Sequence, residues 1–238
     1  MARPIDLTWY PSEPDLSLEA DLWRAGIYRV AGLDEAGRGA IAGPVAVGAL
    51  ILPPDTTLKQ KLAGVRDSKE LTPQQRAEWA ERLKAIALAW AVGFASNQEI
   101  DALGIVPATR LAAMRAIASL TEQAQYLLLD WLLLPESPLP QTALVKGDAR
   151  SLTIAGASIL AKTARDALMV QLDVEYPGYG FAIHKGYGTF QHLKALECLG
   201  LSSLHRLSFR PICNPSNSAD ERHEFRKPHA GEYLHTGE

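Results

Sequence analysis

The sequence predicts an α/β fold in which helices flank a mixed β-sheet. Short runs of apolar and β-branched residues alternate with longer segments whose apolar residues recur at helical spacing. Glycine and proline separate many of these segments. The 238 residues, 47% hydrophobic and 21% charged, are enough for one domain whose core needs no disulfide or structural metal.

The first half of the predicted domain contains three strands and two helices. Strands are expected at residues 28–33, 44–52 and 90–95, and helices at 72–88 and 107–120. The first two strands enclose a Gly-rich turn, so we expect them to pair as neighbours. Thr72 is a suitable N-cap for the first helix, and Pro73 suits its first turn.

The second half adds two strands and two helices. Strands are expected at residues 126–129 and 142–145, and helices at 153–175 and 189–199. The Pro-rich segment 135–140 is expected to form a loop. A last structured stretch is expected near residues 209–211.

The ends of the chain are less apolar than its middle. Residues 1–26 are polar, contain prolines and show no clear period, which predicts a loosely ordered lead-in. Residues 214–238 are rich in His, Glu and Lys and have few apolar anchors, which predicts a disordered tail. The folded domain is therefore expected at residues 27–213.

Several classes of protein are not supported by the composition. The two cysteines, Cys198 and Cys213, are too few for a disulfide framework and lack zinc-site spacing. The longest apolar run, residues 126–134, is too short for a membrane span and contains Asp130. The first residues lack the apolar core of a secretion signal. We therefore expect a cytoplasmic protein with no membrane partner.

The charge distribution is compatible with a nucleic-acid partner. The net charge of the chain is −3, which alone argues against a polyanion. Residues 146–210, however, contain eight Lys or Arg and five Asp or Glu, a net charge of +3. Because a nucleic-acid enzyme needs cations only along the backbone track, the overall value does not decide the question.

Four acidic residues lie where predicted strands end. Asp34 and Glu35 follow the first strand, Asp130 follows the fourth, and Asp148 follows the fifth. Carboxylates that converge at strand ends are natural ligands for Mg²⁺ or Mn²⁺. Any one of them could instead be a solvated cap, but Asp130 interrupts a run of leucines, where an unpaired charge is costly.

Two glycine-containing loops are candidates for substrate contacts. Gly37 and Gly39 flank Arg38, a combination that allows close backbone approach and offers a forked donor to phosphate. A later loop combines Lys185 with Tyr187, which suits a backbone contact together with stacking on a sugar or base. Taken alone, each loop is also explained as an ordinary turn.

Six segments resemble motifs of prokaryotic ribonuclease HII, of the type 2 ribonuclease H family, and they follow in the same order. The first reads GLDEAGRGAIAGPV, and the fifth reads HKGYGT. The segments lie at residues 32–45, 67–71, 146–148, 157–166, 184–189 and 205–209. The resemblance covers about residues 31–211.

The resemblance implies a ribonuclease H-like mixed sheet flanked by helices, with a small helical C-terminal portion. It implies an endoribonuclease that hydrolyses the RNA strand of RNA–DNA hybrids. Such an enzyme also cuts 5′ of single ribonucleotides in duplex DNA and leaves 3′-hydroxyl and 5′-phosphate ends. Two Mg²⁺ or Mn²⁺ ions are expected in the active complex. The catalytic and metal-binding residues are then Asp34, Glu35, Asp130 and Asp148.

The same resemblance assigns substrate contacts and partners. The Gly-Arg-Gly element is expected to recognise the 2′-hydroxyl, and the tyrosine is expected to contact the sugar at the junction. The substrate-binding residues are then Gly37, Arg38, Gly39, Lys69, Lys146, Lys185 and Tyr187. We expect a monomer whose partner is nucleic acid, either an RNA–DNA hybrid or DNA with embedded ribonucleotides.

Two positions depart from the family pattern, and one acid competes for a role. Trp131 follows the third acid, where Gly is frequent, and Gly156 stands where Ala is commoner. Asp166 is a rival for the fourth acid, but the eighteen-residue step from Asp130 favours Asp148. We expect Asp166 to be a structural ion partner inside a helix.

Two other functions are compatible with parts of the pattern. One is a DNA resolvase or transposase of the wider ribonuclease H-like superfamily, and the other is a non-catalytic module that binds hybrids. The complete set of four acids argues against the second. The Gly-Arg-Gly turn and Tyr187 favour ribose recognition over DNA cutting.

Overall fold

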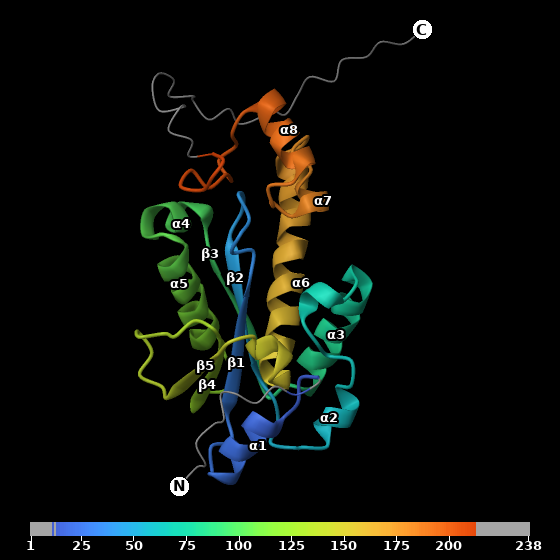
Figure 1. Cartoon of the computed structure of the whole chain (residues 1–238), viewed down its shortest axis with the longest axis vertical. Coiled ribbons are helices and arrows are strands. Elements are labelled where there is room, and N and C mark those ends of the chain that lie inside the picture. The colour runs from blue at the N-terminus through green and yellow to red at the C-terminus, as the bar shows by residue number, and fades with distance from the viewer. Residues whose placement is uncertain (1–10, 12, 213–238) are drawn as a thin grey trace.

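The computed structural model describes residue 11 and residues 13–212 of the chain, and Figure 1 shows their arrangement. A five-stranded sheet in the order β3-β2-β1-β4-β5 forms its centre. The strands are β1 (Val30–Ala36), β2 (Val45–Ile51), β3 (Ala89–Ala95), β4 (Tyr126–Asp130) and β5 (Gln141–Leu144). The strand β2 pairs antiparallel with both β1 and β3, whereas β1, β4 and β5 pair parallel. The predicted mixed sheet is confirmed, with strand ends that differ by up to three residues.

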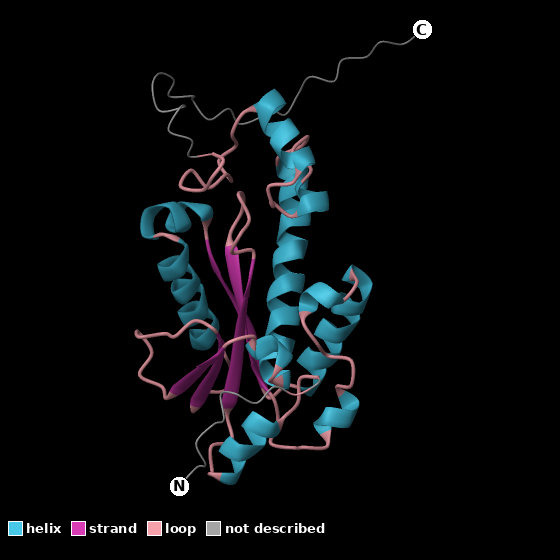
Figure 2. Cartoon of the chain, viewed as in Figure 1, coloured by secondary structure: helices cyan, strands magenta, loops and turns pink. Residues whose placement is uncertain are grey.

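Helices cover both faces of the sheet (Figure 2). The long helix α6 (Leu152–Glu175) packs on β1 and β2, and α3 (Pro73–Ile86) packs against α6. The opposite face carries α5 (Ile105–Ala118), preceded by the short α4 (Asn97–Leu103). The described residues contain no helix long and apolar enough to cross a membrane.

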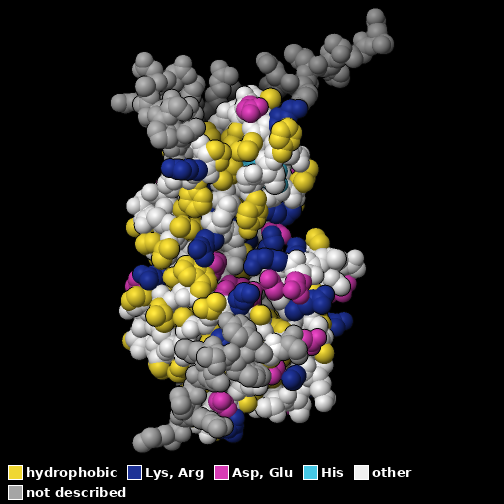
Figure 3. Space-filling model, in the orientation of Figure 1, with side chains coloured by type: hydrophobic (Ala, Val, Ile, Leu, Met, Phe, Trp, Pro, Cys, Tyr) yellow, Lys and Arg dark blue, Asp and Glu magenta, His cyan; other side chains and the backbone are white. Residues whose placement is uncertain are grey.

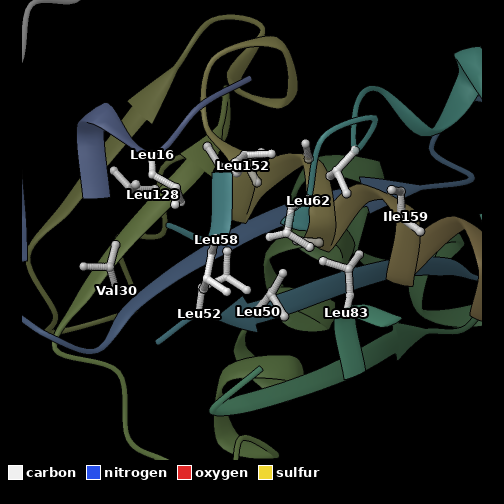
Figure 4. Close-up of a cluster of buried hydrophobic side chains, with 14 of the residues drawn as sticks. Leu16, Val30, Leu50, Leu52, Leu58, Leu62, Leu83, Leu128, Leu152 and Ile159 are labelled. Atoms are coloured by element: carbon white, nitrogen blue, oxygen red, sulfur yellow. The ribbon is translucent and has the colours of Figure 1, made fainter. Parts of the chain in front are cut away.

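Two glycines let α6 lie directly on the sheet. A Cβ on Gly32 of β1 would stand 2.4 Å from the carbonyl carbon of Thr153. A Cβ on Gly48 of β2 would stand 2.2 Å from the carbonyl oxygen of Ala157. Figure 4 shows the adjoining core, to which Leu50 of β2, Leu83 of α3 and Ile159 of α6 all belong. The backbone of α6 is therefore held at a fixed distance from β1, whose end carries two of the predicted acids.

The N-terminal expectation is wrong in part. Instead of a loose lead-in, helix α1 (Ser17–Arg24) packs Leu18, Leu22 and Trp23 into the core. Glu19 is fully buried, and its carboxylate accepts hydrogen bonds from the Ser151 hydroxyl (2.6 Å) and from the side chain and backbone N–H of Thr153. An anion at the N-terminus of α6 is favoured by the free N–H groups there. Residues 1–10 and 12 lie outside the described residues.

The C-terminal portion continues beyond one end of the sheet, around the far end of α6 (Figure 1). It contains α7 (Phe181–His184) and α8 (Phe190–Leu199), so the small helical C-terminal portion that was expected is present. The short helices α2 (Leu58–Lys61), η1 (Ser68–Glu70) and η2 (Gly147–Ala149) lie in connections. The expected tail at residues 214–238 lies outside the described residues.

Candidate active site

The four predicted acids are gathered by the parallel pairing of β1 and β4. Leu33 of β1 is in register with Leu129 of β4, so Asp34 and Asp130 leave neighbouring strands at the same edge. Glu35 is the next residue of β1, and Asp148 lies in η2, shortly after β5. The Oδ1 atom of Asp130 accepts a 2.7 Å hydrogen bond from the N–H of Gly147, which holds η2 against the end of β4.

Burial and mutual repulsion perturb these acids. Burial raises the pKa of Asp34 well above its usual range, and the charges of Glu35 and Asp130 add to the effect. Burial also raises the pKa of Asp130 to about 6, although the N–H of Gly147 stabilises the carboxylate and opposes this rise. The pKa of Asp148 is raised by burial and by Asp67. Carboxylates that raise one another's pKa in this way have the chemistry of a site for hard divalent cations.

Glu35 is turned toward two other side chains. The Trp131 Nε1–H donates to both carboxylate oxygens of Glu35 at 2.9 Å, and Arg38 Nη1 lies 3.5 Å from Oε1. The Arg38 guanidinium also lies over the Trp131 ring, 4.0 Å from its centroid. In the described part of the chain, no three acidic, His or Cys side chains are placed to hold one ion together as they stand. Joint ligation of one ion by the four acids would therefore need their side chains to move closer together.

Trp131 has a left-handed backbone, with φ of +48°. This conformation favours glycine, the residue that the family motif leads us to expect at this position. The tryptophan instead brings its indole into contact with both Glu35 and Arg38. The residue that follows the third acid therefore contacts the second acid, Glu35.

A hollow of about 780 Å³ opens beside the acids. It joins three of the acids to several of the residues predicted to bind substrate. Its lining includes Asp34, Glu35, Asp130, Gly37, Arg38, Gly39, Lys69 and Tyr187. Figure 3 shows acidic and basic side chains meeting across the middle of the molecule. Carboxylates for metal ions and cations for phosphates thus occur side by side.

Two predicted lysines lie outside this hollow. Lys185 lines an adjacent hollow of about 450 Å³, with Tyr187 shared between the two. Lys146 is exposed at the start of η2 and lines neither hollow. Asp148 is likewise absent from the lining of both hollows, although its charge acts on Asp34 and Asp130.

The sequence prediction did not assign two further cations of the site. Lys162 and Arg76 line both hollows, and both reach Asp166, at 2.7 and 3.5 Å. Asp166 is thus the structural ion partner that was expected. Lys162 belongs to one of the segments that resemble the family, so that motif was the available signal. Arg76 has no such signal, because only the packing of α3 on α6 brings it to the site.

A family model described as Ribonuclease HII matches residues 31–212. The chain belongs to the ribonuclease HII family. Curated relatives named Ribonuclease HII from Synechococcus sp. (strain JA-3-3Ab), Thermus thermophilus and Roseiflexus castenholzii are 53%, 52% and 48% identical. The matches cover 84%, 82% and 91% of this chain, and 90%, 92% and 98% of the relatives. The resemblance predicted from the motifs is confirmed.

Solved structures support the same fold. The ribonuclease H2 of Pyrococcus horikoshii OT3 is 26% identical, with a TM-score of 0.64, and the match covers 78% of this chain and 95% of that one. The PCNA:RNase HII complex from Archaeoglobus fulgidus contains a chain that is 25% identical, also with a TM-score of 0.64. That match covers 76% of this chain and 95% of the other. The expected ribonuclease H-like architecture of the ribonuclease HII family is therefore confirmed.

Proposed function

We propose that the chain is a metal-dependent endoribonuclease that hydrolyses the RNA strand of RNA–DNA hybrids. It also cuts 5′ of single ribonucleotides embedded in duplex DNA. The observation that carries this proposal is the meeting of Asp34, Glu35 and Asp130 with the Gly37–Gly39 turn around one hollow. Family membership supports the same activity.

The four acids would hold the divalent ions, Mg²⁺ or Mn²⁺. Such ions, when bound, supply an activated water and stabilise charge on the leaving oxygen. Asp34 is buried, and its carboxylate accepts hydrogen bonds from the Ser158 hydroxyl and from the N–H of Glu35 (2.7 Å). Asp130 is fixed by the Gly147 N–H. Each of these two side chains is thereby oriented by the fold before any substrate binds.

The substrate is bound by residues around the acids. Arg38 offers a guanidinium to a phosphate next to the ribonucleotide, and the Gly37–Gly39 backbone reads the 2′-hydroxyl. Tyr187 packs on the sugar at the junction. Lys69, Lys146 and Lys185 contact the backbone, and counterion release at these contacts makes affinity fall with salt. The 2′-hydroxyl serves recognition, and water is the nucleophile.

A cleavage assay tests the proposal directly. The substrates are a DNA duplex with one ribonucleotide, the same duplex without it, and an RNA–DNA hybrid. With Mg²⁺ or Mn²⁺ we expect cutting of the first and third, with 3′-hydroxyl and 5′-phosphate ends. Excess chelator should abolish cutting, and Ca²⁺ should support little, because its looser coordination misplaces the attacking water.

Three results would contradict the proposal. Full activity in chelator would exclude metal catalysis. Cutting of the all-DNA duplex would favour a DNA resolvase. Cyclic phosphate ends would show that the 2′-hydroxyl attacks, which the proposed role of water excludes.

A further inference from the structure

Two arginines near the candidate active site are fully buried and lack acidic partners. Arg165 of α6 and Arg206 are each 0% exposed. Neither forms a salt bridge with any described residue, and their hydrogen bonds all go to backbone carbonyl oxygens. Burying a guanidinium in this way is costly, and burial lowers the pKa of Arg206 to about 9. A cost of this kind calls for a role beyond filling the core.

Arg206 fixes the peptide planes of the Gly-Arg-Gly turn. Its Nη2 donates to the carbonyl of Gly37 (2.8 Å), its Nη1 to that of Arg38 (2.9 Å), and its Nε to that of Gly43 (2.9 Å). A trans peptide is planar, with the carbonyl and the following N–H pointing in opposite directions. With the two carbonyls held inward by Arg206, the N–H groups of Arg38 and Gly39 point away from it.

These two N–H groups are available to a ligand. Arg38 and Gly39 are exposed, and both line the hollow beside the acids. Within the described residues, neither backbone N–H donates to a protein acceptor. Free backbone donors normally find a partner in water or in a ligand.

Arg165 packs against the same turn and joins the segment that follows it to the loop that carries Tyr187. Its Nη1 donates to the carbonyl of Lys185 (2.9 Å), and its Nε and Nη2 donate to those of Pro44 and Ala42 (2.8 and 3.2 Å). A Cβ on Gly37 would lie 1.8 Å from Arg165 Nε, so the turn rests on the guanidinium. The Arg165 Cζ atom also lies 5.6 Å from the centre of the Tyr187 ring.

We propose that Arg165 and Arg206 are positioning residues that aim the N–H groups of Arg38 and Gly39, together with Tyr187, at the ribose 2′-hydroxyl. This inference rests on the proposed function, because it takes the turn to be the ribose reader. The two guanidiniums touch no reacting atom. They set the ability to tell ribose from deoxyribose and leave affinity for the nucleic-acid backbone unchanged.

Arg206→Lys and Arg165→Lys test the inference, because lysine keeps the buried charge but cannot span three carbonyls. Fluorescence anisotropy with Ca²⁺ gives the Kd for a duplex with one ribonucleotide and for the same duplex in all-DNA form. The ratio of the two Kd values measures ribose discrimination. We expect ribose discrimination, measured by this ratio, to fall about tenfold in each variant, which is the effect of losing one or two hydrogen bonds. The Kd for the all-DNA duplex should stay within about twofold of wild type.

The matched control is Arg115→Lys. Arg115 also donates to a backbone carbonyl, that of Phe94, and to Glu99, but it is half-exposed and lines neither hollow. This variant should keep the wild-type ratio. Melting curves for all proteins ensure that binding is measured well below each Tm. If one of the two site variants does not fold, the other decides, because both arginines support the same turn.

The outcomes separate this inference from the proposed function. A wild-type protein without ribose discrimination would overturn both. If the wild type discriminates and both site variants keep its Kd ratio, even with a lowered Tm, the arginines only stabilise the fold. A parallel loss of affinity for both duplexes would also overturn the inference, because backbone binding would then depend on them.

Discussion

The indole N–H of Trp131 donates to both carboxylate oxygens of Glu35, at 2.9 Å each. The bond stabilises the charged form of a carboxyl whose pKa is raised by burial and held down by Trp131 and Arg38. Trp131→Phe should therefore raise the Glu35 pKa further. Titration of the metal-free protein followed by carboxyl ¹³C NMR measures this shift directly.

The control for this titration is Trp90→Phe. Trp90 lies on β3 beside Lys84, and β2 separates that strand from β1, which carries Glu35. Its replacement should leave the Glu35 titration unchanged. An unchanged titration in Trp131→Phe would show that the indole N–H does not stabilise the carboxylate.

Loss of any one acid should abolish most turnover. Asp34→Asn, Asp130→Asn and Asp148→Asn should each lower kcat by orders of magnitude, because charge that holds the metal ions is lost where phosphoryl charge develops. Single-turnover cleavage of the one-ribonucleotide duplex measures the effect. Asp166→Asn should keep substantial activity, since Asp166 pairs with Lys162 and Arg76. Near-normal turnover in one of the three would remove that residue from the site.

Asp130→Asn should also stabilise the metal-free protein at neutral pH. The pKa of Asp130 is raised to about 6, so stability from its protonated form is present below pH ~4 and lost as the pH rises to about 6. The uncharged Asn side chain avoids this loss of stability, and its amide oxygen can still accept the hydrogen bond from the Gly147 N–H. With solvent screening, we expect a gain of roughly 1–2 kcal/mol at pH 7.5 and little change at pH 4.

Thermal unfolding of the wild type and of Asp130→Asn at pH 4 and pH 7.5 measures this stability difference. Asp166→Asn is the control of opposite sign, because it removes a carboxylate that two cations share. An equal gain at pH 4 and pH 7.5 in Asp130→Asn would mean that ionisation is not its cause.

Tyr187 should act mainly through its ring. Tyr187→Phe should stay within about tenfold of wild type in kcat/KM, under roughly 1.4 kcal/mol, whereas Tyr187→Ala should fall much further. The loss should be largest on DNA with one embedded ribonucleotide, because no neighbouring 2′-hydroxyl can compensate there. Kinetics on that duplex and on an all-RNA hybrid measure the difference. Equal losses on both substrates would show that Tyr187 does not read the junction.

The sheet was predictable because its strands are short apolar runs that end in turn-forming or acidic residues. The structure adds the parallel pairing of β1 with β4, which places Asp34 beside Asp130. The helix α1 was missed although Leu18 and Leu22 have helical spacing, because the segment is short and follows several prolines. Their burial depends on packing against the distant start of α6, which no local pattern indicates.

The roles of the buried arginines were not predictable for a similar reason. Arg165 and Arg206 occur in motifs that resemble the family, yet nothing in the sequence indicates which carbonyls they reach. Their hydrogen bonds to Pro44 and Gly37 span 121 and 169 residues of chain, so they exist only in the folded structure. Local pattern specifies elements, whereas such long-range contacts depend on how the elements pack.

Helix α6 sets a fixed spacing between chemistry and recognition. Ser158, which bonds Asp34, and Arg165, which supports the proposed ribose-reading turn, are seven residues apart on one uninterrupted helix. Seven residues correspond to about 10 Å along the axis. One residue inserted between them would turn Arg165 by about 100° around the helix and lengthen that spacing. Under the proposed function, the place of the cut relative to the recognised sugar would therefore depend on the spacing of these two residues along α6.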